Sequence, residues 1–587
     1  MHTGRSRVSF PLLVALLVAV AACSAPTPSQ PTRQQQPNAP QAQGPRTTKS
    51  LTLGITSGVQ AMSVLGAPTT SGGWHSLNEV HSNGLITSDV GSRRAVGRLA
   101  ERVPAIDDGS ISVLPDGRMR VIFHLRNGVT WQDGTPFTSR TLAFSHRLNS
   151  DPGIPSSQRD AMNRIESVEA PDDYTFTINY KEPYYLGASL GVRFFWPLPE
   201  HILGPAYERY LVSRNADDVV NDPYWTSGYT HLGPFRLTSF DPSDGLTLEA
   251  YDGYFLGRPK VDVVRIRTFS DENTLFSNLL ANSVDMFPDI ALASELGFQL
   301  KDRWESGGGG TVHVKGGITW FLAPQWRQAV QTEPANLDPR VRAALYHALD
   351  REALSEGLQA GHPEFAAWSM LPPGDALYDS TKDAMRRYAY DPDRSKALLT
   401  ETGWTAGPDG IMRNSVDGRR FHNAMWTTPG RDREIAAFSS YWRRIGLEVD
   451  EFVVPAAQVR NLEYRAQYPN WESTAQGAGD AILGRMDGPP ATAETRWVGE
   501  RGGFDDPRAA ELLARFRSSL SPTAQAQGMK AISDYVADTL PFLIIYYLPD
   551  HVGARKGVKA FDDVEGGAEA AQPYGTYSRN SHLWDIQ

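Results

Sequence analysis

The stretch from residue 119 to residue 148 constrains the fold most, because it specifies a strand, two turns and a helix in succession. Residues 119–126 alternate apolar and polar side chains, which is the pattern of a half-buried strand. Asn127-Gly128 and Asp133-Gly134 predict turns, since glycine accepts a positive φ and Asn or Asp tolerates it. Thr138 then stands where it can cap a helix with one apolar face.

Strands and helices also alternate farther along the chain. Asp338-Pro339 and Asp391-Pro392 each predict the start of a helix, because Asp caps and Pro suits the first turn. Residues 425–449 predict a strand, a helix and a second strand. This alternation predicts an α/β fold.

The N-terminal residues are predicted to lie outside the fold. Arg5 and Arg7 precede an apolar run at residues 8–22, which is shorter than the roughly 20 residues that span a bilayer. Residues 1–22 therefore read as a signal peptide. The V-A-A-C ending resembles a bacterial lipobox, which implies cleavage before Cys23 and lipid on its sulfur. The alternative is an ordinary signal peptide with an incidental cysteine.

Residues 23–50 are predicted to be a disordered tether behind the lipid anchor. Six prolines and many glutamines leave almost nothing to bury. A loose coil of this length reaches on the order of 30 Å. Because Cys23 is the only cysteine, we expect an exported body without an intramolecular disulfide.

The composition of the body excludes several classes of protein. The net charge is −10, and no basic stripe appears, which argues against a nucleic-acid partner. No later segment approaches 18 uninterrupted apolar residues, so we expect no further membrane span. The motifs H-E-x-x-H and S-x-x-K are both absent, and histidines are scattered. We therefore predict neither an enzyme, nor a metal site, nor a cofactor.

The wording of the 119–148 stretch resembles a known family. F-H-L-R-N-G-V-T-W-Q-D-G-T-P-F-T resembles the signature of the family 5 extracellular solute-binding proteins, the peptide-binding components of ABC importers. Further phrases of this family follow in the same order, at residues 168–175, 233–237, 341–352 and 541–547. The resemblance extends from about Leu51 to about Phe561.

The resemblance implies a fold and its boundaries. The expected fold is a periplasmic-binding-protein type II-like two-lobed α/β fold with an additional intermediate subdomain, known as cluster C. Lobe I is expected to comprise residues 51–94, 226–318 and 541–587, and residues 95–225 form its intermediate subdomain. Lobe II is expected to comprise residues 319–540.

The resemblance also implies where a ligand binds. Peptide-binding members close two lobes over an extended peptide, with main-chain hydrogen bonds to strand edges. An acidic residue of lobe II near a Trp pairs with the peptide's amino terminus, which makes Trp471 and Asp480 candidates. The usual W-x-x-D spacing is absent, however, and Glu472 stands beside the Trp. Arg485 could bind a carboxylate of the ligand.

Aromatic residues are the remaining candidates for ligand contact. Trp74, Trp320, Phe321 and Trp426, together with Trp471, suit the stacking of sugars or rings. The alternative for Trp74 is ordinary packing within a lobe, and for Trp471, Asp480 and Arg485 it is a place in a surface loop. The weak match to the amine anchor leaves room for a ligand other than a peptide.

The sequence thus predicts a monomeric, lipid-anchored receptor outside the cytoplasmic membrane, in the periplasm or on the membrane's outer face. It would capture short peptides and deliver them to an ABC permease driven by a separate ATPase. The alternatives are the same fold with an oligosaccharide, a metal complex or haem as ligand, and a ligand sensor without transport. A secreted hydrolase is a more distant rival.

Overall fold

A computed structural model describes residues 47–56, 58–59, 61–63, 65, 74–88, 95–192, 194–477, 480–487, 490–495, 497–561 and 576–587, without the side chains of residues 75, 160 and 480. The predicted signal peptide, the lipidation site Cys23 and most of the tether lie outside the described residues. Residues 48–587 form one compact unit, to which the description below refers.

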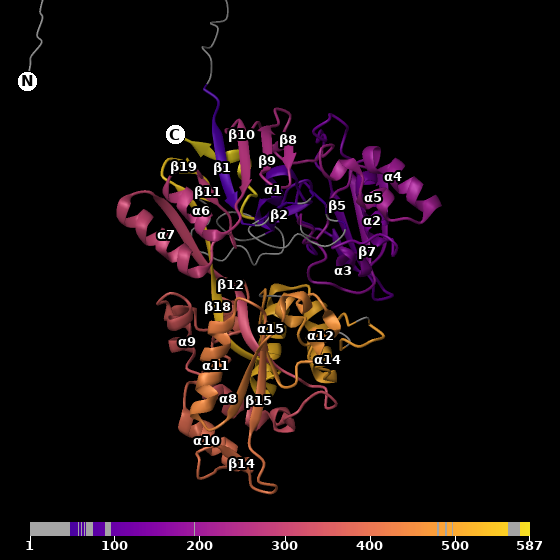
Figure 1. Cartoon of the computed structure of the whole chain (residues 1–587). Coiled ribbons are helices and arrows are strands. Elements are labelled where there is room, and N and C mark those ends of the chain that lie inside the picture. The colour runs from indigo at the N-terminus through magenta and orange to yellow at the C-terminus, as the bar shows by residue number, and fades with distance from the viewer. Residues whose placement is uncertain are drawn as a thin grey trace, which may run out of the picture. The chain divides into compact units, whose positions relative to one another are not determined.

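A ten-stranded sheet runs through this unit (Figure 1). Its strands lie in the order β16-β15-β17-β12-β18-β11-β1-β10-β9-β8. Its strands are β1 (Ser50–Ile55), β8 (Phe235–Asp241), β9 (Gly245–Ala250), β10 (Val263–Thr268), β11 (Met286–Phe287), β12 (Gly310–Pro324), β15 (His422–Thr427), β16 (Glu448–Val453), β17 (Trp471–Gly477) and β18 (Leu543–Arg555). The two longest strands, β12 and β18, lie side by side in the middle of the sheet. They connect the strands of lobe I to those of lobe II.

The strands on either side of this pair run toward its middle. In lobe I, β1 is parallel to β10 and β11, and β11 ends beside Gly553 of β18. In lobe II, β15 is parallel to β16 and β17, and β17 ends opposite Ile318 of β12. The carboxyl ends of both parallel groups therefore face the same segment of the β12–β18 ladder. Ligands of open α/β sheets bind outside such carboxyl ends.

A smaller antiparallel sheet, β4-β5-β7-β6, stands apart from the large one. It consists of β4 (Ile111–Val113), β5 (Met119–His124), β6 (Ile165–Asp172) and β7 (Thr175–Tyr180). The alternating residues of β5 are buried and partly exposed in turn, so the predicted strand is confirmed. The predicted helix is confirmed as α2 (Ser139–Ser150), but Thr138 at its N-cap makes no side-chain capping hydrogen bond.

Helices cover the sheets in both lobes. Within the bounds expected for lobe I are α1 (Asn78–His81), α2, α3 (Arg159–Asn163), α4 (Glu200–Ser213), α5 (Asp217–Val220), α6 (Glu272–Leu280) and α7 (Ser294–Gly307). Within the bounds expected for lobe II are α8 (Pro339–His347), α9 (Arg351–Leu358), α10 (Pro392–Glu401), α11 (Asp432–Arg444), α12 (Leu462–Ala466), α13 (Asp480–Leu483), α14 (Pro507–Arg517) and α15 (Pro522–Thr539). Within the described ranges, no helix has both the length and the apolar character needed to cross a bilayer.

The remaining regular elements are short strand pairs. They are β2 (Ile86–Ser88) with β3 (Ala95–Gly97), β13 (Trp404–Ala406) with β14 (Met412–Asn414), and β19 (Val558–Lys559) with β20 (Asp585–Ile586).

The two predicted helix starts are confirmed, since Asp338 accepts the Arg340 N–H and Asp391 accepts the Arg394 N–H.

Separate apolar cores stabilise the parts of the unit. One core joins buried residues between Trp320 and Tyr547, and a second joins β1 to the segment around Trp225 and to the C-terminal residues. A third lies under the β4–β7 sheet, and a fourth lies between α6 and α7.

Two further contacts join the lobes besides the β12–β18 pair. Phe298 of α7 stacks on His362 of lobe II. The Tyr185 amide donates to the Arg517 carbonyl at 2.7 Å.

The ladder between β12 and β18 is irregular where the chain passes between the lobes. Its register shifts between Gly316 and Ile318 and again between Trp320 and Phe321. A Cβ atom at Gly316 would lie 2.9 Å from the Cβ of Tyr547, whereas a Cβ at Gly317 would lie 3.9 Å from its nearest neighbour. The Tyr547 hydroxyl donates to the carbonyls of Ser369 and Leu371, so this ring has little freedom to move.

Gly316→Ala is therefore expected to destabilise the protein by ~1–3 kcal/mol through overpacking. Gly317→Ala is the matched control and should change stability by less than about 1 kcal/mol. Thermal unfolding of both variants checks the difference. Equal unfolding temperatures for the two variants would contradict the close packing of this crossing.

Candidate functional site

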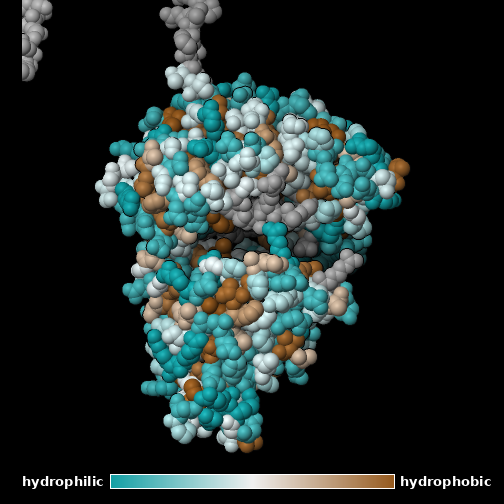
Figure 2. Space-filling model, viewed as in Figure 1, coloured by the Kyte–Doolittle hydropathy of each residue, from teal (hydrophilic) through white to brown (hydrophobic). Residues whose placement is uncertain are grey.

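The lobe I side of the candidate site is the loop that follows β11. This loop continues past Phe287 along β18, and the Ile290 N–H donates to Asp550 Oδ1 at 2.8 Å. The Thr56 hydroxyl, just after β1, donates to the Ala291 carbonyl at 3.3 Å. Figure 2 shows that the surface of the unit Thr48–Gln587 is hollowed between the two lobes. The loop thus lies at the carboxyl edge of the lobe I strands, beside the crossing.

Three charged side chains are buried at the crossing itself. Lys315 of β12 lies opposite Asp550 of β18, and its ammonium lies 4.1 Å from the centroid of the Tyr577 ring. Asp289 is only 3% exposed, and within the described part of the chain its Oδ1 has no hydrogen-bond partner. Burial and the neighbouring Asp289 raise the pKa of Asp550 to about 7, although Lys315 opposes this shift.

The lobe II side presents an arginine on a tryptophan. Trp320 of β12 is buried, and its indole N–H donates to the Ser473 hydroxyl at 3.1 Å. Arg431 follows β15, and its guanidinium carbon lies 5.0 Å from the centroid of the Trp320 ring. Glu434 pairs with Arg431 at 3.0 Å, yet the Arg431 side chain remains 40% exposed. A half-exposed guanidinium held in this way has donors left for an anion.

Arg431 was not among the residues expected from the sequence. A lone arginine after a predicted strand carries no motif, and the register of the sheet is what brings it to Trp320. The only signal available was its place in T-P-G-R, between a predicted strand and a predicted helix.

Trp426 of β15 points away from the buried core that contains Met425. It is half-buried, and its ring packs against Phe452 at 4.5 Å and Tyr464 at 5.5 Å between centroids. These three rings form a partly exposed aromatic cluster, which is available for stacking.

The other expected aromatic residues lie inside the cores. Trp74 stacks on His81 at 5.3 Å, and Phe321 is fully buried. Trp471 is also fully buried, donates its indole N–H to Asn336 Oδ1 at 3.1 Å and packs against Trp442. Their faces are occupied by packing partners. Of the five expected aromatic residues, only Trp426 is partly exposed, whereas Trp320 is buried beneath Arg431.

Arg485 is part of a buried ion network centred on Glu472. It lies 3.5 Å from Glu472 and 3.6 Å from Glu500, and its side chain is 8% exposed. Glu472 also pairs with Arg465 and, at 2.8 Å, with Arg501. Burial alone would raise the pKa of Glu472, but the three arginines lower it below its ordinary value. The charge of Arg485 is therefore matched within lobe II.

Asp480 begins helix α13, but its side chain lies outside the described residues.

Within the described ranges, no group of three or more His, Cys, Asp or Glu residues is arranged to hold a metal ion.

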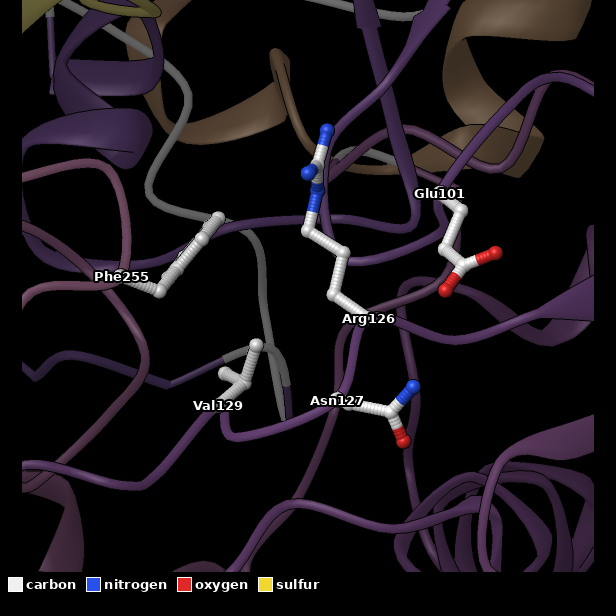
Figure 3. Close-up of a pocket in the computed structure, with 5 residues that line it drawn as sticks. All are labelled: Glu101, Arg126, Asn127, Val129 and Phe255. Atoms are coloured by element: carbon white, nitrogen blue, oxygen red, sulfur yellow. The ribbon is translucent and has the colours of Figure 1, made fainter.

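A separate polar pocket of about 360 Å³ lies in lobe I (Figure 3). It is lined by Glu101, Arg126, Asn127, Val129 and Phe255. Arg126 donates its Nε–H to the Arg98 carbonyl at 2.7 Å, and Figure 3 shows its side chain between Phe255 and Glu101. No lining residue comes from β12, β18 or lobe II, so this pocket is distinct from the crossing.

Glu472→Gln should destabilise the protein by ~3–5 kcal/mol, because it leaves buried arginines without their counter-charge. The matched control is Glu401→Gln, which breaks an exposed pair with Arg394 at 3.1 Å and should cost less than about 1 kcal/mol. Chemical denaturation measures both. Similar small effects would show that the network is not a structural centre of lobe II.

The pH dependence of stability should reveal Asp550. Its folded-state pKa of about 7 lies above its ordinary value, so its contribution is complete below that ordinary value and is lost as pH rises through about 7. Asp550→Asn stays neutral and keeps an oxygen for the Ile290 N–H. The unfolding temperature of the wild type should therefore fall relative to the variant between about pH 4 and about pH 7. Parallel curves would contradict the raised pKa.

Comparison with known proteins places this geometry in a family. The family model described as "Bacterial extracellular solute-binding proteins, family 5 Middle" matches residues 95–495. The chain is 22% identical over 457 residues to the oligopeptide-binding protein AppA of Bacillus subtilis, covering 76% of this chain and 78% of AppA. It is 26% identical over 422 residues to heme-binding protein A of Haemophilus influenzae, covering 67% of each.

Solved structures share the fold. The oligopeptide-binding protein of Thermus thermophilus, complexed with a pentapeptide, superposes with a TM-score of 0.67 at 22% identity. The match covers 92% of this chain and 98% of that one. The predicted two-lobed periplasmic-binding-protein fold is thereby confirmed. The chain belongs to the bacterial extracellular solute-binding proteins of family 5.

Proposed function

We propose that this protein captures short peptides outside the cytoplasmic membrane and delivers them to an ABC permease with a separate ATPase. The observation that carries the proposal is the convergence of the two strand groups on the β12–β18 crossing. Arg431 on Trp320 lies at the lobe II edge of this convergence, and the loop around Ile290 lies at the lobe I edge.

The two edges offer complementary chemistry. The half-exposed guanidinium of Arg431 suits a ligand carboxylate, which every free peptide carries at its C-terminus. A peptide main chain adds hydrogen bonds that tolerate different side chains. A ligand bound to both edges favours the closed arrangement over the open one, because only the closed arrangement makes both sets of contacts.

The chain outside the described residues completes the proposal. Lipid on Cys23 would anchor the protein, and the segment that follows it would tether a monomeric body within reach of its permease. The tether ends earlier than residue 50, since Ser50 already belongs to β1 and Lys49 donates its backbone N–H to Asp262. The partition into lobe I (51–94, 226–318, 541–587), the intermediate subdomain (95–225) and lobe II (319–540) belongs to the same proposal, except that residues 542–547 pack in the core of lobe II, so the boundary lies within β18. Asp480 stays a candidate for the peptide's amino group.

A second candidate ligand is a carboxylate-bearing ring or metal complex, such as haem. The partly exposed cluster of Trp426, Phe452 and Tyr464 favours it, since flat rings stack on aromatic side chains. One relative is named as heme-binding, whereas two other matches are named as oligopeptide-binding.

Mass spectrometry of the small molecules released from protein purified without refolding tests the ligand class. A set of short peptides is the expected result. A single haem, sugar or metal complex would overturn the peptide assignment and leave the fold unaffected.

Arg431→Ala should weaken binding of the released ligand at least tenfold, because the guanidinium contributes about 1.5 kcal/mol or more to a charged hydrogen bond. Arg444→Ala is the matched control, since Arg444 lies at the other end of α11 and stacks on Tyr441 at 4.8 Å. Calorimetric titration measures both. Equal affinities for the two variants would remove Arg431 from the site.

A further inference from the structure

The loop that follows β11 exposes an apolar side chain and buries charged ones beside it. Ile290 is 47% exposed, whereas Asp289 beside it and Asp550 opposite it are almost completely buried. Folded proteins usually bury isoleucine and expose aspartate, so this pattern is informative.

The backbone of Ile290 is also strained. Its φ is +61°, in the left-handed region that β-branched residues rarely adopt. Such conformations persist only where the surrounding structure imposes them, and they cluster at ligand sites. Here the Ile290 N–H donates to Asp550 Oδ1 at 2.8 Å, so a side chain of the crossing strand β18 holds the strained residue.

The loop is fixed on its other side as well. Ala291 and Leu292 are buried in the core between α6 and α7. The Ala291 carbonyl accepts the Thr56 hydroxyl, and the Ala293 N–H donates to Glu272 at 2.7 Å. Because the residues around it are anchored, Ile290 is presented in one position rather than by a mobile loop.

The position of Ile290 relative to the two lobes follows from the strand order of the sheet. Asp550 lies on β18 between residues of the lobe I core, such as Val552, and the lobe II core that ends near Tyr547. Ile290 donates its backbone N–H to Asp550, so it lies beside this part of β18, at the carboxyl edge of β1 and β11. It therefore stands at the lobe I edge of the proposed cleft, whose lobe II edge carries Arg431.

We propose that Ile290 is a specificity-determining contact for an apolar group of the solute, and that Asp550 is the residue that positions it. The inference rests on the proposed function and names its substrate class: a carboxylate-bearing peptide with an apolar side chain, whose carboxylate binds Arg431 and whose side chain packs on Ile290.

Ile290→Gly separates this role from ordinary packing. Glycine adopts the left-handed conformation without strain, so the unfolding temperature should stay the same or rise. The probes are the tripeptides alanine–leucine–alanine and alanine–glycine–alanine. Wild-type protein should bind the leucine peptide about tenfold more tightly, and the variant should reduce this preference below about threefold. Ile106→Gly, at another exposed isoleucine, is the matched control and should preserve the preference.

Asp550 variants test the positioning role. Asp550→Asn keeps an acceptor oxygen for the Ile290 N–H and should preserve the preference, whereas Asp550→Ala should lose it. An unchanged preference in Ile290→Gly, or a lowered unfolding temperature in that variant, would overturn the inference alone. A wild-type protein that binds neither tripeptide and releases no peptide would overturn the proposed function and, with it, this inference.

Discussion

The antiparallel pairing of β12 with β18 is the interaction on which the rest of the structure depends. These strands pair along almost their whole length, from Gly310 opposite Arg555 to Leu322 opposite Leu543. Each strand contributes one end to lobe I and the other to lobe II, so the lobes share a hydrogen-bonded ladder as well as a chain connection. Because the neighbouring parallel strands end at the middle of this ladder, its position determines where a ligand can contact both lobes.

The ladder is regular toward its lobe I end and irregular where it passes into lobe II. Its register shifts fall near Gly316 and Trp320, next to the buried charges of Lys315, Asp289 and Asp550. Buried charges are costly unless they are paired, so this segment contributes less to stability than an apolar segment of the same size would. A weak and irregular segment between two well-packed cores is where a change in lobe arrangement costs least. The contacts of Phe298 with His362 and of Tyr185 with Arg517 would have to adjust in such a change.

The sequence predicted the fold better than the site. Period-two and helical patterns predicted β5 and α2, and the Asp-Pro pairs marked the starts of α8 and α10, because these signals are local. The role of a tryptophan is not local. Trp471 is buried because Asn336 and Trp442, distant in sequence, occupy its polar edge and its face. Arg431 and Ile290 could not be recognised, because the first depends on Trp320 across the sheet and the second on a backbone angle fixed by Asp550.

A solute held between the two edges is expected to change the arrangement of the lobes at the β12–β18 crossing. The most direct test is a spin-label distance measurement in a Cys23→Ser chain carrying Val212→Cys on α4 and Val416→Cys after β14, two positions that are almost fully exposed. Ligand-stripped protein should give a broader distance distribution with a longer mean, which shortens and narrows when the released ligand is added back. The same distribution with and without bound ligand would contradict the account.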